Sequence, residues 1–191
     1  MNQYKGEDKM KKLLSLILCA ALLCGLAGCG SLQDILGAVI QYAESDTAQY
    51  NKILSDAGIE HSSPVFGENT ASYVKADEQG NVLCADYVYK SDVVSSWAET
   101  TYIPVSGYTE DQVLEIQRTI KTELDYLDLL ACCSLRFNHV GDYLKITCVF
   151  TEVDKEENYS SIYRANLSTE ESAISMKVSE DLLLGDGYVK K

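Results

Sequence analysis

From residue 71 onward, apolar side chains recur at every second position in several short runs. This spacing predicts β-strands over residues 72–76, 82–89 and 93–104, because alternate side chains of a strand point to opposite faces of a sheet. The sequence Asp-Glu-Gln-Gly-Asn at 77–81 is typical of a turn between the first two strands.

The period changes to that of a helix over residues 109–127. Thr109 followed three residues later by Gln112 forms a capping box, which marks a helix start. The apolar residues behind it fall on one helical face. They are Val113, Ile116, Ile120, Leu124 and Leu127.

A β-hairpin is predicted next, with strands over residues 131–140 and 143–153. Gly141-Asp142 supplies the two turn residues, since glycine adopts the positive φ that such turns need. We expect the inward face of this hairpin, Leu135, Phe137, Ile146 and Phe150, to receive the helix 109–127.

The hairpin register also decides the state of two cysteines. With this turn, Cys133 lies opposite Phe150, so Cys133 and Cys148 are diagonal neighbours. Their Cα atoms are then expected to be too far apart for an unstrained disulfide. We therefore expect two unbridged, buried thiols that fill the core. The sequence leaves the redox state of Cys84 and Cys132 open.

The remaining segments are less regular. Residues 31–57 favour a helix and 58–70 a loop, which together suggest an N-terminal helical arm. Residues 154–160 are expected to form a charged loop, and a helix is expected near the C-terminus, from Thr169 or over 179–184. The fold class is therefore α+β, with an antiparallel sheet of about five strands packed against one long amphipathic helix.

The first 28 residues have the features of an export signal. Met10-Lys11-Lys12 precedes 14 uncharged residues, 13–26, too few for the roughly 20 of a membrane-spanning helix. Leu26-Ala27-Gly28-Cys29 follows and resembles the lipobox of bacterial lipoproteins, in which the cysteine becomes the acylated N-terminus. An uncleaved anchor and an ordinary secretory peptide are the alternatives, and translation begins at Met1 or at Met10.

The predicted domains follow from this motif. They are a signal peptide at 1–28, a lipid anchor with helical arm at 29–70, and an α+β domain at 71–191. Two acyl chains suffice for stable attachment, because each buried methylene contributes about 0.8 kcal/mol. We therefore expect the protein to be held by Cys29 on the extracytoplasmic face of the cell membrane.

Charge narrows the range of partners. Loss of residues 1–28 removes four lysines and two acids, which changes the net charge from −13 to −15. Such a chain repels nucleic acid and anionic lipid headgroups. The expected partners are the membrane, through the lipid, and an envelope protein, a peptide or a glycan.

The lipobox, the short strands, the Gly-Tyr-Thr-Glu-Asp-Gln helix start at 107–112 and the final hairpin together resemble the YehR-like lipoproteins. These are small bacterial envelope proteins of uncharacterised activity. The resemblance spans residues 71–167 and implies an α+β fold with an antiparallel sheet. It implies no activity.

Few residues of the sequence suggest a catalytic, metal-binding or ligand-binding role. His61 and His139 are the only histidines, and both are expected to be ordinary surface residues. The acidic cluster at 152–157 lacks the spacing of a calcium loop. Tyrosines on the predicted strands suggest either an exposed binding face or the usual strand preference of tyrosine. They are Tyr73, Tyr87, Tyr89 and Tyr102.

No catalytic set, metal site or cofactor is therefore predicted. The leading hypothesis is a non-enzymatic binding or structural module anchored at the cell envelope. The alternative is a cell-surface hydrolase that uses paired carboxylates, which cannot be singled out among so many acids. A deep pocket with two facing carboxylates would favour the hydrolase, and a tyrosine-lined sheet face would favour binding.

Overall fold

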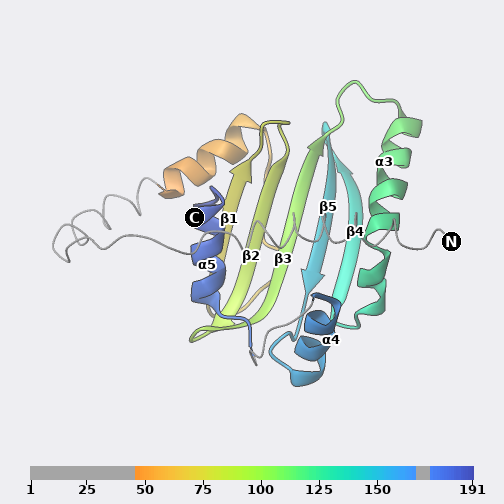
Figure 1. Cartoon of the computed structure of the whole chain (residues 1–191). Helices are drawn as coiled ribbons and strands as arrows, with labels where there is room; N and C mark the ends of the chain where they lie inside the picture. The colour runs from red at the N-terminus through yellow and green to blue at the C-terminus, as the bar shows by residue number, and fades with distance from the viewer. Residues whose placement is uncertain (1–45, 167–172) are drawn as a thin grey trace.

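The computed structural model describes residues 46–166 and 173–191. Its centre is a six-stranded antiparallel sheet in the order β4-β5-β3-β2-β1-β6 (Figure 1). The strands are β1 (Thr70–Ala76), β2 (Val82–Lys90), β3 (Val93–Pro104), β4 (Cys133–Val140), β5 (Tyr143–Phe150) and β6 (Val189–Lys190).

The predicted fold class is confirmed. The five strands expected from the period-two pattern are present, and β3 has the expected bounds. The sixth strand, β6, is only two residues long and pairs with β1. A strand this short has no period of its own, which is why the sequence pattern did not reveal it.

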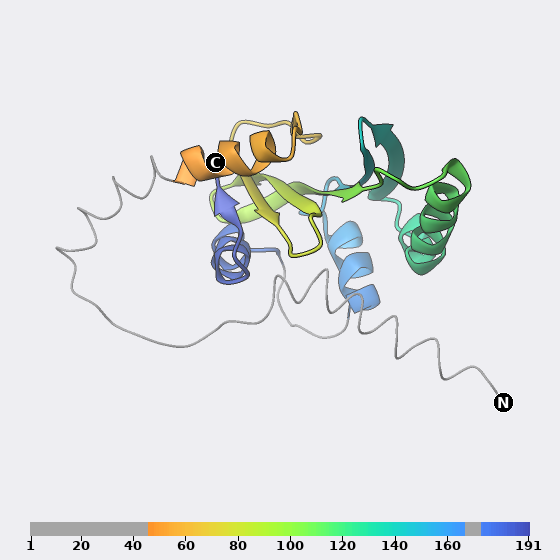
Figure 2. The same ribbon diagram turned by 90° about the horizontal axis from the view of Figure 1, so that it is seen from above.

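Three helices and a 3₁₀ turn lie on one face of the sheet, here called the three-helix face. The helices are α3 (Glu110–Glu123), α4 (Glu156–Asn166) and α5 (Met176–Gly185), and the 3₁₀ turn is η1 (Asp125–Leu129). Figure 2 shows α4 and α5 on the side of the sheet opposite to the helix at 46–56. The largest core cluster joins this face to the helices and includes Trp97, Leu127, Phe150, Ile162 and Leu183.

The opposite face, here called the N-terminal face, is covered by the helix at 46–56 and the loop after it. Tyr50 and Leu54 of the helix are buried against Val74 and Tyr102 of the sheet. Gly67 of the loop lies so close to the sheet that an added Cβ would be 2.2 Å from Val88 Cγ1. These residues are therefore part of the folded body, where an arm was expected. The predicted helix residues before 46 lie outside the described part of the chain.

The helix α3 begins as predicted. The Thr109 side chain accepts a hydrogen bond from the Gln112 backbone, and the Gln112 side chain accepts one from the Thr109 backbone. The α-helix ends at Glu123, and the expected last turn is the separate 3₁₀ turn η1, which carries buried Leu127. The residues of the predicted apolar stripe therefore reach the core from two elements, α3 and η1.

One predicted loop is wrong. Residues 154–160 contain the start of α4, whose first turn holds Glu156 and Glu157. Acids there are stabilised by the positive end of the helix dipole. Among the residues of α4 whose side chains the structure describes, Tyr159 and Ile162 are buried, and two such positions are too few to reveal a helical period.

The hairpin register is as predicted. Val140 pairs with Tyr143, and Gly141 in the turn has φ +55°. Cys133 lies opposite Phe150 and Cys148 lies opposite Leu135.

Candidate functional site

Two carboxylates sit within the central strands, at positions where a charged residue needs a partner. Asp86 is on β2 and Glu99 is on the neighbouring β3. In the register, Asp86 pairs with Ala98 and Glu99 pairs with Ala85. Side chains one residue apart on a strand point to opposite faces, so Asp86 faces the N-terminal face and Glu99 the three-helix face.

Asp86 is the centre of a buried hydrogen-bond network. Its Oδ2 accepts a bond of 2.8 Å from His61 Nε2, and its Oδ1 accepts one of 2.6 Å from the Ser72 hydroxyl. The other ring nitrogen, Nδ1, lies 3.0 Å from the Tyr102 hydroxyl. The His61 and Asp86 side chains are each 1% exposed. Each of the four side chains therefore has a hydrogen-bond partner within the network.

The order of these bonds argues against nucleophilic catalysis. In a serine triad the hydroxyl bonds to the histidine, which removes its proton, and the carboxylate orients the histidine from the other side. Here the Ser72 hydroxyl bonds to Asp86 instead, and the histidine has Tyr102 on its far side. The network has the geometry of a structural tie between the loop and the sheet.

The expectation for His61 was therefore wrong. Its side chain is buried because the loop folds back over the sheet, which brings it to residues 25 and 41 positions away. His139 is exposed, as expected. The acidic residues 152, 154, 156 and 157 are also exposed, and Glu152 forms an ion pair with Lys155 at 2.7 Å.

Glu99 has a different environment on the three-helix face. Its cross-strand neighbours are Ala85 on one side and Cys148 on the other. The Trp97 side chain, two residues away on the same face, donates a hydrogen bond to the carboxylate. Burial nevertheless raises the pKa of Glu99 to about 7. The residue is half-buried, so it combines an unfavourable site for charge with access to solvent.

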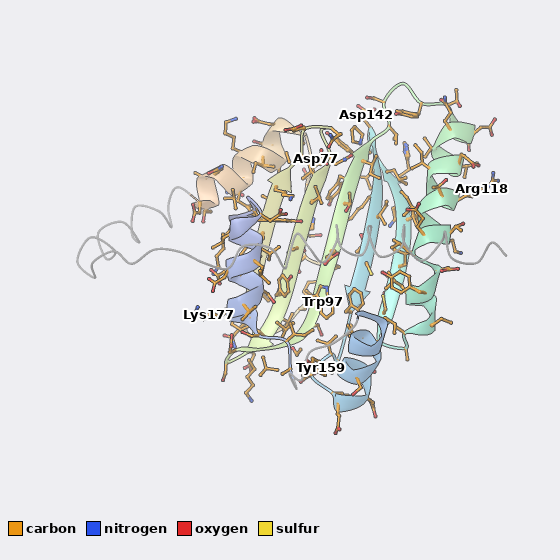
Figure 3. The ribbon with its side chains drawn as sticks, in the orientation of Figure 1. Asp77, Trp97, Arg118, Asp142, Tyr159 and Lys177 are labelled. Carbon is orange, nitrogen blue, oxygen red and sulfur yellow. The ribbon has the colours of Figure 1, made fainter. Side chains whose placement is uncertain are left out.

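Tyrosines from three parts of the chain lie close enough to Glu99 for its charge to affect their pKa values. Its charge contributes to raising the pKa of Tyr87 on β2, Tyr126 in η1 and Tyr188 before β6, although burial is the larger cause for each. Figure 3 shows Trp97 over the middle of the sheet, between α5 and α3. Glu99 thus has the aromatic side chains of Trp97 and these tyrosines among its neighbours.

The idea of an exposed tyrosine face needs correction. Tyr73, Tyr87 and Tyr102 are buried, and Tyr89 is half-buried. Tyr102 also points to the N-terminal face, so the strand tyrosines do not form one surface.

The burial of the residues around Glu99 differs along the strands. Thr101 and Ile103 continue the same face of β3 and are half-buried, as is Leu83, which pairs with Thr101. In the other direction Trp97 and Tyr87 are buried. Leu83, Thr101 and Ile103 are therefore the less buried neighbours of Glu99 on this face.

Two thiols lie beside this environment. The Sγ atoms of Cys133 and Cys148 are 3.4 Å apart, which is a hydrogen-bonding contact between thiols that are not covalently bonded. The hydrogen bond to Cys133, and then burial, raise the pKa of the Cys148 thiol. The pair is unbridged and packs against the core cluster of the three-helix face, as expected, but both cysteines are half-buried where full burial was expected.

The residues predicted to carry lipid and signal, Leu26, Ala27, Gly28 and Cys29, lie outside the described part of the chain. Within that part, no helix is both long and apolar enough to cross a membrane. The sequence analysis missed Asp86 and Glu99. The available signal was their position: each is the single acid of its strand, and the one other charged residue of the two strands is Lys90 at the end of β2.

Protein-family profiles gave no match, and curated protein sequences gave none. Solved structures similar to this chain include the NMR structure of the YehR protein of E. coli. It has 17% identity and a TM-score of 0.44, with 65% of this chain and 91% of that chain covered. The NMR structure of a protein from Streptococcus pneumoniae TIGR4 has 19% identity and a TM-score of 0.41, with 70% and 94% covered.

Proposed function

We propose that this chain is a YehR-like lipoprotein, anchored through Cys29 on the extracytoplasmic face of the cell membrane, and that it is a non-catalytic binding module. Its binding surface is the three-helix face around Glu99. The lipobox and the order of strands, helix and hairpin in the sequence support the family and the compartment.

One observation favours binding over hydrolysis. The two carboxylates within the central strands, Asp86 and Glu99, point to opposite faces of the sheet. Glycoside hydrolysis needs two carboxyl groups about 5–10 Å apart on either side of one bond. Asp86 is also enclosed by its own hydrogen bonds. Glu99 is left as a single carboxylate among aromatic rings, which suits recognition of a ligand.

The anchor is tested by a cysteine variant. Cys29→Ala should abolish incorporation of labelled palmitate and release the protein from the membrane fraction, because the thiol carries the lipid. Cys24→Ala is the matched control, since Cys24 lies in the apolar signal region, and labelling should be unchanged. Palmitate incorporation that persists in Cys29→Ala would contradict the assignment.

A further inference from the structure

The fold places two thiols, those of Cys133 and Cys148, in direct contact. Cys133 begins β4 and lies opposite Phe150, so Cys148 on β5 is its diagonal neighbour. Diagonal positions usually keep the Cα atoms too far apart for a disulfide without movement of the backbone. Here the side chains converge, and the two Sγ atoms are 3.4 Å apart. A disulfide bond of about 2.05 Å needs the sulfur atoms to approach by only about 1.4 Å more.

The place of the pair in the sheet allows this approach. Within the described residues, β4 is an edge strand that pairs with β5 alone (Figure 1). Its residues are half-buried or exposed along the whole strand. A strand with few buried contacts shifts at a lower cost in free energy than a strand in the middle of a sheet. Cys133 and Cys148 are both half-buried, so each residue also keeps some surface exposed to solvent.

The other two cysteines of the described chain have different surroundings. Cys84 is buried on the N-terminal face of β2, whereas Cys148 points to the three-helix face. Cys132 precedes β4 and is buried as well. Burial raises the pKa of the Cys84 and Cys132 thiols, which lowers the fraction of reactive thiolate. These two residues therefore serve as internal controls.

We propose that Cys133 and Cys148 are a reversible redox pair, oxidised to a disulfide by thiol–disulfide exchange with a low-molecular-weight disulfide. Cys133 is the attacking sulfur and Cys148 the resolving sulfur. This inference goes beyond the proposed function and does not rest on it, because the chemistry needs only the folded chain and the disulfide reagent.

The contact between the two sulfurs assigns these roles. A disulfide is attacked by a thiolate rather than by a thiol. The hydrogen bond to Cys133, and then burial, raise the pKa of the Cys148 thiol, so Cys148 keeps its proton near neutral pH. The first attack therefore falls to Cys133, which lies on the edge strand.

The exchange has two steps. The Cys133 thiolate, having lost its proton to solvent, attacks one sulfur of R–S–S–R, which forms a mixed disulfide and releases R–S⁻. Cys148 then loses its proton, and its sulfur attacks Cys133 Sγ. This forms the bond between Cys133 and Cys148 and releases the second R–S⁻. The two released thiolates take up the two protons, so two protein thiols are oxidised by two electrons and one disulfide is reduced to two thiols.

Oxidation fastens the start of β4 to the sheet. The Cys133 backbone N–H donates a hydrogen bond of 3.0 Å to the Leu130 carbonyl, directly after η1. A bond from Cys133 to β5 therefore also ties the end of η1 to the sheet. The redox state of the pair sets how firmly this edge of the molecule is held.

Peptide mapping of the native protein tests the pair. The mature lipidated protein in neutral detergent, without denaturant, is equilibrated with glutathione disulfide and glutathione at a series of ratios. The exchange is quenched with acid, thiols are alkylated under denaturing conditions, and peptides are identified by mass spectrometry. We expect a peptide linked through Cys133 and Cys148 to accumulate as the disulfide share rises and to disappear when glutathione is restored. Cys84 and Cys132 should remain alkylated throughout.

Two results of this mapping would overturn the proposal. One is the absence of the linked peptide at the highest share of glutathione disulfide. The other is a bridge that includes Cys132 or Cys84. Because the native chain is mapped, this test does not depend on the folding of any variant.

Variants separate the attacking sulfur from the resolving one. Cys148→Ser should accumulate a mixed disulfide of glutathione on Cys133, because nothing resolves it. Cys133→Ser should react with glutathione disulfide at least about tenfold more slowly, since burial of Cys148 remains and each unit of raised pKa lowers the thiolate fraction tenfold. Cys132→Ser is the matched control and should form the linked peptide as the native protein does. Equal rates in Cys133→Ser and Cys148→Ser contradict the assigned roles.

Discussion

At the scale of single residues, the two carboxylates inside the sheet have different hydrogen-bond environments. Asp86 receives hydrogen bonds on both oxygens from Ser72 and His61. Glu99 receives one from the Trp97 side chain, and burial raises its pKa. A charge with few partners in a partly buried site costs stability, and such residues cluster at functional sites.

Glu99 should make stability depend on pH in a defined direction. Its pKa is about 7 in the folded protein, against an ordinary value near 4.5. Between these values the folded state keeps a proton that the unfolded state releases. The contribution to the free energy of unfolding is therefore full below about pH 4.5 and is lost as pH rises through 7. The loss is about 3 kcal/mol.

Urea unfolding at several pH values between 4.5 and 8 measures this effect. The stability of Glu99→Gln relative to the native protein should rise by that amount over the range, because glutamine does not titrate. A constant difference between the two proteins would show that the carboxyl has an ordinary pKa.

At the scale of elements, α3 and the β4–β5 hairpin form one packing unit. Val113 is buried against Leu144 and Ile146, and Ile116 and Phe137 pack beside them. Ile120 also contacts the main core cluster, so it links the two clusters. The capping box positions the start of the helix, and the hairpin register positions the apolar face that receives it.

Ile120→Ala should lower the free energy of unfolding by about 1–2 kcal/mol. The effect falls below that of a fully buried isoleucine because Ile120 is only half-buried. Leu114→Ala is the matched control, since Leu114 is 40% exposed on the same helix, and it should change stability by less than about 0.5 kcal/mol. Urea denaturation followed by circular dichroism measures both. Equal effects would mean that the helix presents another face.

At the scale of the whole molecule, the sheet is covered on both faces, and the N-terminal segment provides one of the covers. Tyr50 and Leu54 pack on that face, and His61 bonds to Asp86 and Tyr102 beneath the loop. Residues 46–69 are therefore joined firmly to the body of the protein.

His61→Ala tests this attachment. It leaves the buried Asp86 carboxylate with the Ser72 hydroxyl as its hydrogen-bond donor, so we expect a loss of roughly 2–4 kcal/mol. Hydrogen exchange should also accelerate in residues 58–69. His139→Ala, the change of the exposed histidine, should leave both measurements unaltered. If hydrogen exchange in residues 58–69 is unchanged in His61→Ala, the network does not hold the loop on the sheet.

Local patterns were sufficient wherever the interaction that forms an element is close in the sequence. The capping box of α3 joins residues three apart, and the hairpin turn joins Val140 to Tyr143. Alternation of apolar and polar residues likewise predicted the five longer strands. By contrast, α4 has only two described buried positions, and β6 is formed through its pairing with β1. Neither element therefore shows a regular spacing of apolar residues in the sequence.

The sequence by itself determined the α+β class, the main strands, the start of α3 and the register of the hairpin, because each follows from side-chain period or turn chemistry within a short stretch. Only the tertiary structure decided that His61 is buried, that residues 46–69 cover a sheet face, and that Glu99 lies among Tyr87, Tyr126 and Tyr188. These contacts join distant parts of the chain, and their energy depends on burial, which no local pattern specifies.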